Sequence, residues 1–216
     1  LEMAAISNAT LLTPPPNGLQ FPPAGMDHLS HTLRPKDKGG VLEFSGTVEV
    51  VSSLERDGRP VFNDLRWGVY VVLEAENDYA ARCFKQYGMN TDNTGRYSSM
   101  FKPFHLIGME LNTSIYSVGI LKKATGYTKA FLGDVIATAK QNLKKGQILD
   151  GEGGFTVWGK LYQSETSKKI RGLPIGLAND VKLKKDVRKD QPITWSDVEI
   201  DLNCPVVKIR EKISLS

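Results

Sequence analysis

The hydrophobic pattern of residues 41–75 predicts two β-strands joined by a hairpin. Residues 41–54 are rich in β-branched side chains and partly alternate, and residues 66–75 carry a continuous apolar run. Between them, Asp57-Gly58 is a hairpin turn signal. Because the second run has no polar alternation, we expect its strand to be covered on both faces. Further strands must pair with these two to complete a central sheet.

Two helices are predicted after these strands, separated by a polar loop. Residues 76–88 form the first, because Asn77 can cap it and apolar residues recur at helical spacing. That stripe consists of Tyr79, Ala80, Cys83, Phe84 and Tyr87. After the loop, residues 89–100, the second helix is predicted over 101–120, with Pro103 in its first turn. Its stripe consists of Phe104, Ile107, Leu111, Ile115 and Val118.

Residues 1–10 predict the tail of a helix. We therefore expect the chain to begin inside a larger protein. Residues 11–40 hold six prolines and four glycines, which predict a long irregular segment. Asp27, His28 and His31 lie there at a spacing that metal ligands use, but without further ligands nearby. We therefore interpret the two histidines as exposed loop residues and predict no metal site.

Residues 134–160 and residues 177–199 resemble each other. Each has an apolar lead-in, a Lys-rich step, a tight turn and a short apolar pair. The matched features are Lys144-Lys145 and Lys184-Lys185, then Gly146 and Asp190, then Ile148-Leu149 and Ile193 with Trp195. Two similar elements that bracket a loop predict a small β-rich unit closed by its own ends.

Other residues of this unit give more local predictions. The glycine-rich residues 150–154 predict a tight turn with positive φ, and an anion-binding nest is the alternative. Trp158 lies in an alternating strand and is predicted to be in the core. Residues 196–212 predict a closing strand followed by a short tail.

The composition is that of a globular protein. The 216 residues are 40% hydrophobic and 24% charged, which suits one large domain or two small ones. The net charge is +4, but no basic stripe is interleaved with aromatics, so nucleic-acid binding is not expected. The sequence has no run of about 18 apolar residues, so no membrane span is predicted. Cys83 and Cys204 lack metal-ligand spacing and predict reduced thiols in a cytoplasmic protein.

Two stretches carry a resemblance to known families. The segments AKQNLKKGQIL and LKKDVRKDQPIT resemble the opening and closing segments of a SAF domain, the small β-clip module of sialic acid synthases and antifreeze-like proteins. The run from FSGTVEVVSSLERDGRPVFNDLRWGVYVVLEA through GRYSSMFKPFHLIGMEL is similar to bacterial homoserine-dehydrogenase-like proteins. That family includes deoxyxylulose-phosphate reductoisomerase-like enzymes, and the resemblance covers nearly all of the chain.

This resemblance implies the C-terminal half of an NAD(P)H-dependent oxidoreductase. One branch converts deoxyxylulose phosphate to methylerythritol phosphate in isoprenoid precursor synthesis, and other branches act on branched sugar acids. Members carry an upstream Rossmann domain, whereas this sequence has no G-x-G-x-x-G and no P-loop. We therefore expect NADP or NAD to be bound by a domain absent from this chain. No cofactor is expected in this chain, which alone should not turn over.

The expected fold is α+β, with a central sheet and two packing helices followed by the SAF-like unit. The predicted domains are 1–133, a partial catalytic and dimerisation domain, 134–204, the β-clip, and 205–216, a tail. A homodimer is expected to form through the sheet of residues 41–75. Two alternatives remain open, a carbohydrate- or anion-binding SAF module without catalysis and a structural dimerisation domain.

A polar group at the start of the second predicted helix is the candidate site for a small anionic substrate, a sugar phosphate or sugar acid. Helix N-termini favour anions, and Arg96 and Ser98 would bind the substrate there. Lys102 and His105 are the catalytic candidates, since histidine can donate a proton or contact a phosphate. A solvated helix start with a capping serine is the alternative interpretation.

Two nearby residues are weaker candidates for the site. Arg66 could reach the substrate from a strand end, but a surface ion pair with Asp64 is the simpler interpretation. Glu110 is not expected to share a helix face with His105, so a catalytic role for its carboxylate is not favoured.

Overall fold

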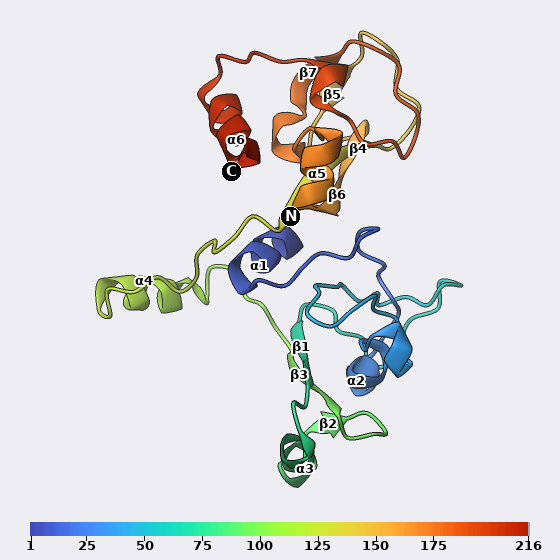
Figure 1. Ribbon diagram of the computed structural model, residues 1–216, viewed down its shortest axis with the longest axis vertical. Helices are drawn as coiled ribbons and strands as arrows, with labels where there is room; N and C mark the ends of the chain where they lie inside the picture. Colours follow the sequence, from blue (N-terminus) through green and yellow to red (C-terminus); the bar gives the residue numbers. More distant parts are fainter. Residues whose placement is uncertain (216) are drawn as a thin grey trace. The chain divides into compact units, whose positions relative to one another are not determined.

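The computed structural model describes residues 1–215, which form two compact units (Figure 1). The central unit is Leu19–Tyr127, and the terminal unit combines Leu1–Gly18 with the chain from Thr128 onward. Helices and small antiparallel sheets occur in both, so the protein is α+β as predicted. The domain limits predicted at 133/134 and 204/205 concern family domains and stay predictions. None of the described helices is both long and apolar enough to cross a bilayer.

The central unit is built around a sheet with the strand order β1-β3-β2. Its elements are the 3₁₀ helix η1 Met26–His28, α2 Leu29–Thr32, the 3₁₀ helix η2 Lys36–Lys38, β1 Val69–Glu74, α3 Asp78–Gln86, β2 Asn90–Thr91, β3 Tyr97–Lys102 and α4 Leu111–Gly119. The prediction of α3 is confirmed, including its cap, because Asn77 Oδ1 accepts the N–H of Ala80 at 3.0 Å.

The strand predicted over residues 41–54 is wrong. The buried carboxylate of Glu49 accepts the backbone N–H groups of Gln20 at 3.0 Å and Phe21 at 3.4 Å. These bonds hold the segment against the proline-rich chain and offer its backbone an alternative to a strand ladder. Among the described residues, the β-pairing of this stretch is limited to isolated bridges.

The polar loop predicted over residues 89–100 is also wrong, because this stretch contains β2 and most of β3. β3 lies between two strands, and it buries Ser98 and Ser99 despite their polarity. The hydroxyl of Ser98 donates to the carbonyl of Asn90 at 3.0 Å, which satisfies it inside the fold. Polarity alone therefore misled the prediction.

The second predicted helix, over residues 101–120, begins only at Leu111. The backbone at Gly108 has a φ of 88°, a left-handed conformation that a helix cannot contain. Before the helix, the carboxylate of Glu110 accepts the N–H of Leu106 at 3.0 Å and closes a turn. Lys102, predicted near the helix start, is the last residue of β3 instead.

One face of the central sheet packs on a small core, and the other is exposed. The core comprises Ala24, Leu29, Leu33 and Leu65, with Tyr70, Val72 and Phe101 packed against it. On the opposite face of β1, Val69 and Val71 are 48% and 45% exposed. The expectation that this strand is covered on both faces is therefore wrong. The stripe predicted for the second helix also stays exposed, as Ile115 at 59% shows, whereas the stripe of α3 is half-buried at Cys83 and Phe84 and exposed at Tyr79.

The terminal unit has two sheets, with strand orders β4-β6 and β5-β7-β8. Its elements are α1 Glu2–Thr10, β4 Gly133–Ala139, β5 Ile148–Asp150, β6 Val157–Gln163, α5 Ser164–Ile170, the 3₁₀ helix η3 Ile175–Leu177, β7 Asn179–Leu183, the 3₁₀ helix η4 Trp195–Asp197, β8 Val198–Glu199 and α6 Pro205–Leu215. Every residue of β4 is buried. Asn8 fixes α1 to the start of β4, because its Oδ1 accepts the N–H of Gly133 at 2.8 Å.

The two similar segments of this unit form reciprocal hydrogen bonds with each other. Leu143 and Val187 each donate their N–H to the other's carbonyl, at 2.8 and 3.0 Å. Asn142 Oδ1 accepts the N–H of Lys189, and Asp186 Oδ1 accepts the N–H of Lys145. The repetition predicted from the sequence is thus present as matched hydrogen bonds between the segments.

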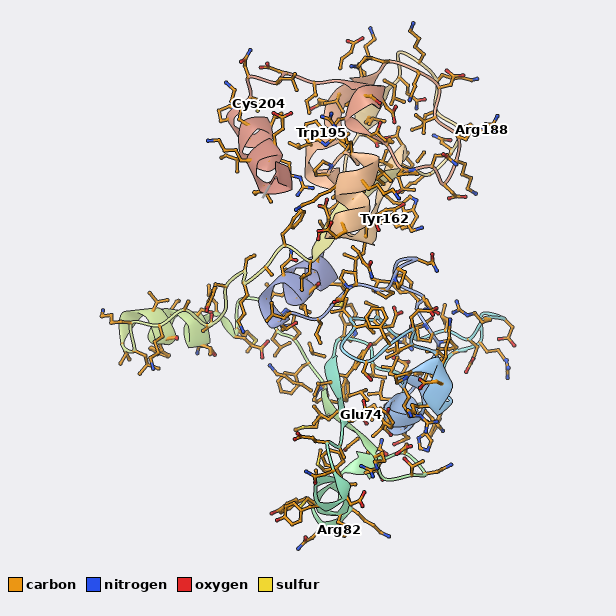
Figure 2. All side chains as sticks on the ribbon, in the orientation of Figure 1. Glu74, Arg82, Tyr162, Arg188, Trp195 and Cys204 are labelled. Atoms are coloured by element: carbon orange, nitrogen blue, oxygen red, sulfur yellow. The ribbon has the colours of Figure 1, made fainter. Side chains whose placement is uncertain are left out.

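The structure corrects the details of that match. Gly146 and Asp190 are equivalent as predicted, since both have positive φ, 85° and 65°, and their N–H groups bond the carbonyls of Leu183 and Ala139. The residues equivalent to Lys144 and Lys145 are consequently Arg188 and Lys189 rather than Lys184 and Lys185. Arg188 is labelled in Figure 2.

Two further predictions for this unit are wrong. Trp158 is 38% exposed rather than part of the core. The closing strand over residues 196–212 is limited to the two residues of β8, and the tail forms the helix α6. Asp134 in β4 holds α6 in place, because the guanidinium of Arg210 donates to its carboxylate.

Candidate functional site

Three polar side chains converge just after β3, and we call them the Lys102–His105–Glu110 cluster. One carboxylate oxygen of Glu110 accepts a hydrogen bond from the ammonium of Lys102. The other lies 3.1 Å from Nδ1 of His105. Lys102 is the last residue of β3, and the turn that precedes α4 places Glu110 next to Lys102. The sequence prediction that Glu110 lies away from His105 is wrong, because no helix separates them.

The electrostatics of this cluster suit acid–base chemistry. The hydrogen bond from Lys102, supported by that from His105, lowers the pKa of Glu110 below its ordinary value. An ionised Glu110 fixes the proton of His105 on Nδ1, which leaves Nε2 as the reactive ring nitrogen. All three side chains are between 30% and 55% exposed, so a substrate can reach them.

The other predicted site residues lie elsewhere. Arg96 pairs with Asp78, and the length of β3 separates it from Lys102 by roughly 20 Å. Ser98 is buried and bonded to the backbone. Arg66 forms an exposed pair with Asp64 at 2.7 Å, and its hydrogen bonds lower the pKa of Asp64 to about 2. The structure therefore brings together only the two catalytic candidates, Lys102 and His105.

A buried network in the central unit escaped the sequence prediction. Arg34 Nη1 lies 2.7 Å from Asp92 Oδ2, and their side chains are 14% and 0% exposed. The other oxygen of Asp92 accepts the N–H of Tyr97 at 3.0 Å, and the hydroxyl of Tyr97 donates to Glu74 at 2.8 Å. Glu74 is labelled at the end of β1 in Figure 2. This network fixes the start of β3 against the chain that follows α2.

Burial and hydrogen bonding set the charges of this network. Burial alone would raise the pKa of Asp92, but the hydrogen bonds from Tyr97 and Thr94 and the charge of Arg34 outweigh it and lower that pKa. Burial, with the hydrogen bond to Glu74, raises the pKa of Tyr97 to about 12. The only sequence signal was the turn at Asp92, because Arg34 lies 58 positions away in the chain.

Metal ligation has no support in the described part of the chain. It contains no group of three or more His, Cys, Asp or Glu side chains able to hold a metal ion. Nε2 of His31 lies 3.1 Å from Oδ1 of Asn93, and Asp27 accepts a hydrogen bond from Asn63. The prediction that both histidines are exposed loop residues is wrong, because His28 ends η1 and His31 lies half-buried in α2. Asp27 and His31 thus bond amide side chains.

The described sheets do not form a Rossmann-type dinucleotide site. All strand pairs in the three sheets are antiparallel, whereas a Rossmann-type site is built from parallel βαβ units. The glycine-rich turn at 150–154 has the predicted positive φ at Gly151 and Gly153. Directly after the turn, the N–H groups of Phe155 and Thr156 donate to the carboxylate of Asp150 at 2.5 and 3.0 Å. A phosphate there would meet that negative charge.

The site thus combines an ammonium, an imidazole and a carboxylate on an α+β scaffold. The family model of the oxidoreductase DRL catalytic domain matches residues 1–111. That range is more than half of the 216 residues. The chain therefore belongs to this family and has the general role of an oxidoreductase. The match includes the whole cluster. No curated protein matches the sequence.

Proposed function

We propose that this chain provides the substrate-binding and proton-transfer part of an NAD(P)H-dependent oxidoreductase acting on a small anionic sugar derivative. The observation that carries the proposal is the family match, which contains the Lys102–His105–Glu110 cluster. Our specific candidate is the reductoisomerase reaction that converts deoxyxylulose phosphate to methylerythritol phosphate in isoprenoid biosynthesis. NADP or NAD would be bound by residues outside this chain and would supply the hydride.

The cluster supports two tasks in such a reaction. The ammonium of Lys102 offers charge and hydrogen bonds to a phosphate or to a developing alkoxide. The doubly protonated imidazolium form of His105, oriented by Glu110 through Nδ1, can donate its Nε2 proton to the carbonyl oxygen as that oxygen becomes an alkoxide, which leaves a neutral imidazole. A cytoplasmic location agrees with the free thiols of Cys83 and Cys204.

The first experiment is an assay of the complete gene product for oxidation of NADPH in the presence of deoxyxylulose phosphate. Oxidation that depends on the sugar phosphate supports the specific proposal. Oxidation only with branched sugar acids would retain the oxidoreductase and replace the substrate. If neither class supports oxidation of NADPH or NADH, the proposal falls.

Lys102→Ala in the complete protein should raise KM for a phosphorylated substrate by about tenfold or more, because a charged hydrogen bond is lost. Steady-state kinetics measures this change, and Lys85→Ala, an exposed lysine of α3, is the matched control. An unchanged KM would remove Lys102 from the binding site.

We also propose that the protein is a homodimer that uses the exposed face of the central sheet. Val71 and Met100 are adjacent on neighbouring strands and are 45% and 56% exposed, and β1 is an edge strand. Such a face, continued by an open strand edge, suits a second copy of the same sheet. Val71→Glu should therefore give monomers in sedimentation, while Lys85→Glu should not. A dimer that persists in Val71→Glu would exclude this face.

For the terminal unit, we propose a SAF-type β-clip. The reciprocal hydrogen bonds between its two similar segments support this assignment. A carbohydrate- or anion-binding role of this unit, without catalysis, is the second candidate function.

A further inference from the structure

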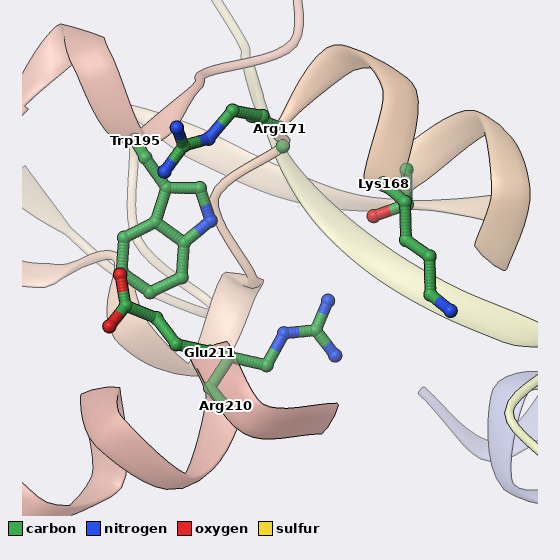
Figure 3. A pocket seen from close by; sticks show the side chains of 7 residues that line it. Lys168, Arg171, Trp195, Arg210 and Glu211 are labelled. Carbon is green, nitrogen blue, oxygen red and sulfur yellow. The ribbon is translucent and has the colours of Figure 1, made fainter. Parts of the chain in front are cut away.

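A pocket of about 450 Å³ opens in the terminal unit, away from the Lys102–His105–Glu110 cluster in sequence and unit (Figure 3). Side chains of α5, of the turn after it, of η4 and of α6 line it. Those that carry chemistry are Lys168, Arg171, Trp195, Arg210 and Glu211. Three cations, one carboxylate and an indole thus face one cavity.

The backbone places Arg171 and Trp195 together. Arg171 ends α5 in the left-handed conformation, with a φ of 50°, which is uncommon for a residue other than glycine. Its carbonyl accepts the N–H of Trp195 at 3.0 Å. Gly172 permits this arrangement, since a Cβ there would lie 2.7 Å from a methyl group of Ile136. Backbone strain of this kind is concentrated at functional sites.

The backbone that carries the indole is also fixed at the start of η4. Trp195 opens η4 inside a capping box, in which the carboxylate of Asp197 accepts the N–H of Thr194 at 2.8 Å. Asp197 is buried and paired with Lys185 at 2.6 Å. The half-buried indole therefore lines the pocket from a fixed stretch of backbone.

The charge of the pocket is not fully compensated from within. Arg210 pairs with Asp134, so its charge is largely used to hold α6. Among the described residues, Lys168 and Arg171 form no ion pair, and the ammonium of Lys168 lies over the ring of Phe131 at 5.6 Å. The guanidinium of Arg171 is exposed beside the cavity. Two cations are thus available to an anionic ligand.

We propose that this pocket binds a small anionic carbohydrate, a sugar phosphate or a sugar acid. Arg171 pairs with the phosphate or carboxylate in the bidentate geometry that guanidinium groups favour, and Lys168 adds a second positive charge. The apolar C–H face of the sugar packs on the indole of Trp195, and Glu211 accepts hydrogen bonds from the hydroxyls. The inference rests on the second candidate function of this unit, and its site is distinct from the proposed catalytic cluster and does not depend on turnover.

The fluorescence of Trp195 tests this proposal directly in the full chain. Trp67→Phe together with Trp158→Phe leaves Trp195 as the only tryptophan of the three. Glucose 6-phosphate and gluconate are the anionic probes, with glucose and inorganic phosphate as references. We expect a saturable change with an anionic sugar, and binding at least about tenfold weaker with glucose or with phosphate alone.

Variants then assign the response to the pocket. Arg171→Asn, which tolerates the left-handed backbone, and Lys168→Ala should each weaken binding by about tenfold. Lys169→Ala, an exposed neighbour on α5 outside the pocket, should leave binding unchanged. Tighter binding of glucose 6-phosphate than of gluconate identifies a sugar phosphate, and the reverse identifies a sugar acid. No saturable response, an equal response to inorganic phosphate, or full binding by folded Arg171→Asn and Lys168→Ala would overturn the proposal.

Discussion

The His105→Gln variant of the complete enzyme is expected to turn over about 10²–10⁴ times more slowly than the wild type. Glutamine can still hydrogen-bond near Glu110, but it cannot donate a proton reversibly near neutral pH. Because His105 is proposed to act on the reacting oxygen and not to bind the anion, KM should change little. Steady-state kinetics of NADPH oxidation measures both parameters.

His28→Gln is the matched control for this prediction, since His28 is an exposed residue at the end of η1, outside the cluster. It should retain wild-type kcat. Glu110→Gln should fall between the two, because it removes the charge that orients His105 and leaves the imidazole in place. If His105→Gln and His28→Gln were equally active, His105 would not be the proton donor, and the cluster would be reduced to a binding site.

Features with a local cause could be predicted from the sequence. Asn77 caps α3 through an N–H three residues away, and Gly151 and Gly153 supply the positive φ that their turn requires. The matched turns at Gly146 and Asp190 were likewise visible in the sequence. In each case the residue that determines the conformation lies inside the element that it determines.

Features with a distant cause could not be predicted in this way. Glu49 removes residues 41–54 from the sheet by binding the backbone at Gln20, which lies 29 positions earlier. The cluster shows the same limit. A helical wheel drawn over 101–120 separates Glu110 from His105, whereas the positive φ at Gly108 turns the chain so that the two meet. One glycine conformation, invisible to periodicity, therefore decides the composition of the candidate site.

The largest stability effect should come from Arg34→Met, which removes the guanidinium from the buried pair with Asp92 and leaves that carboxylate with the hydrogen bonds from Tyr97 and Thr94 but no cationic partner. Breaking a buried ion pair from one side costs about 3–5 kcal/mol. Thermal or urea unfolding of the full chain measures the loss, and hydrogen exchange at β3 locates it in the central unit. Arg59→Met, in an exposed pair with Asp57, should cost about 1 kcal/mol or less.

The pH dependence separates lost charge compensation from lost packing. In the wild type, the pKa of Asp92 is lowered from 3.8, so its stabilising contribution is present above that value and is lost as pH falls through the folded pKa. In Arg34→Met the folded pKa rises, and protonation of Asp92 relieves the variant. The difference in the free energy of unfolding should therefore shrink as pH falls toward 4 and below. A difference that is independent of pH would show that Arg34 acts through its packing on Tyr97, 5.9 Å away, rather than through Asp92.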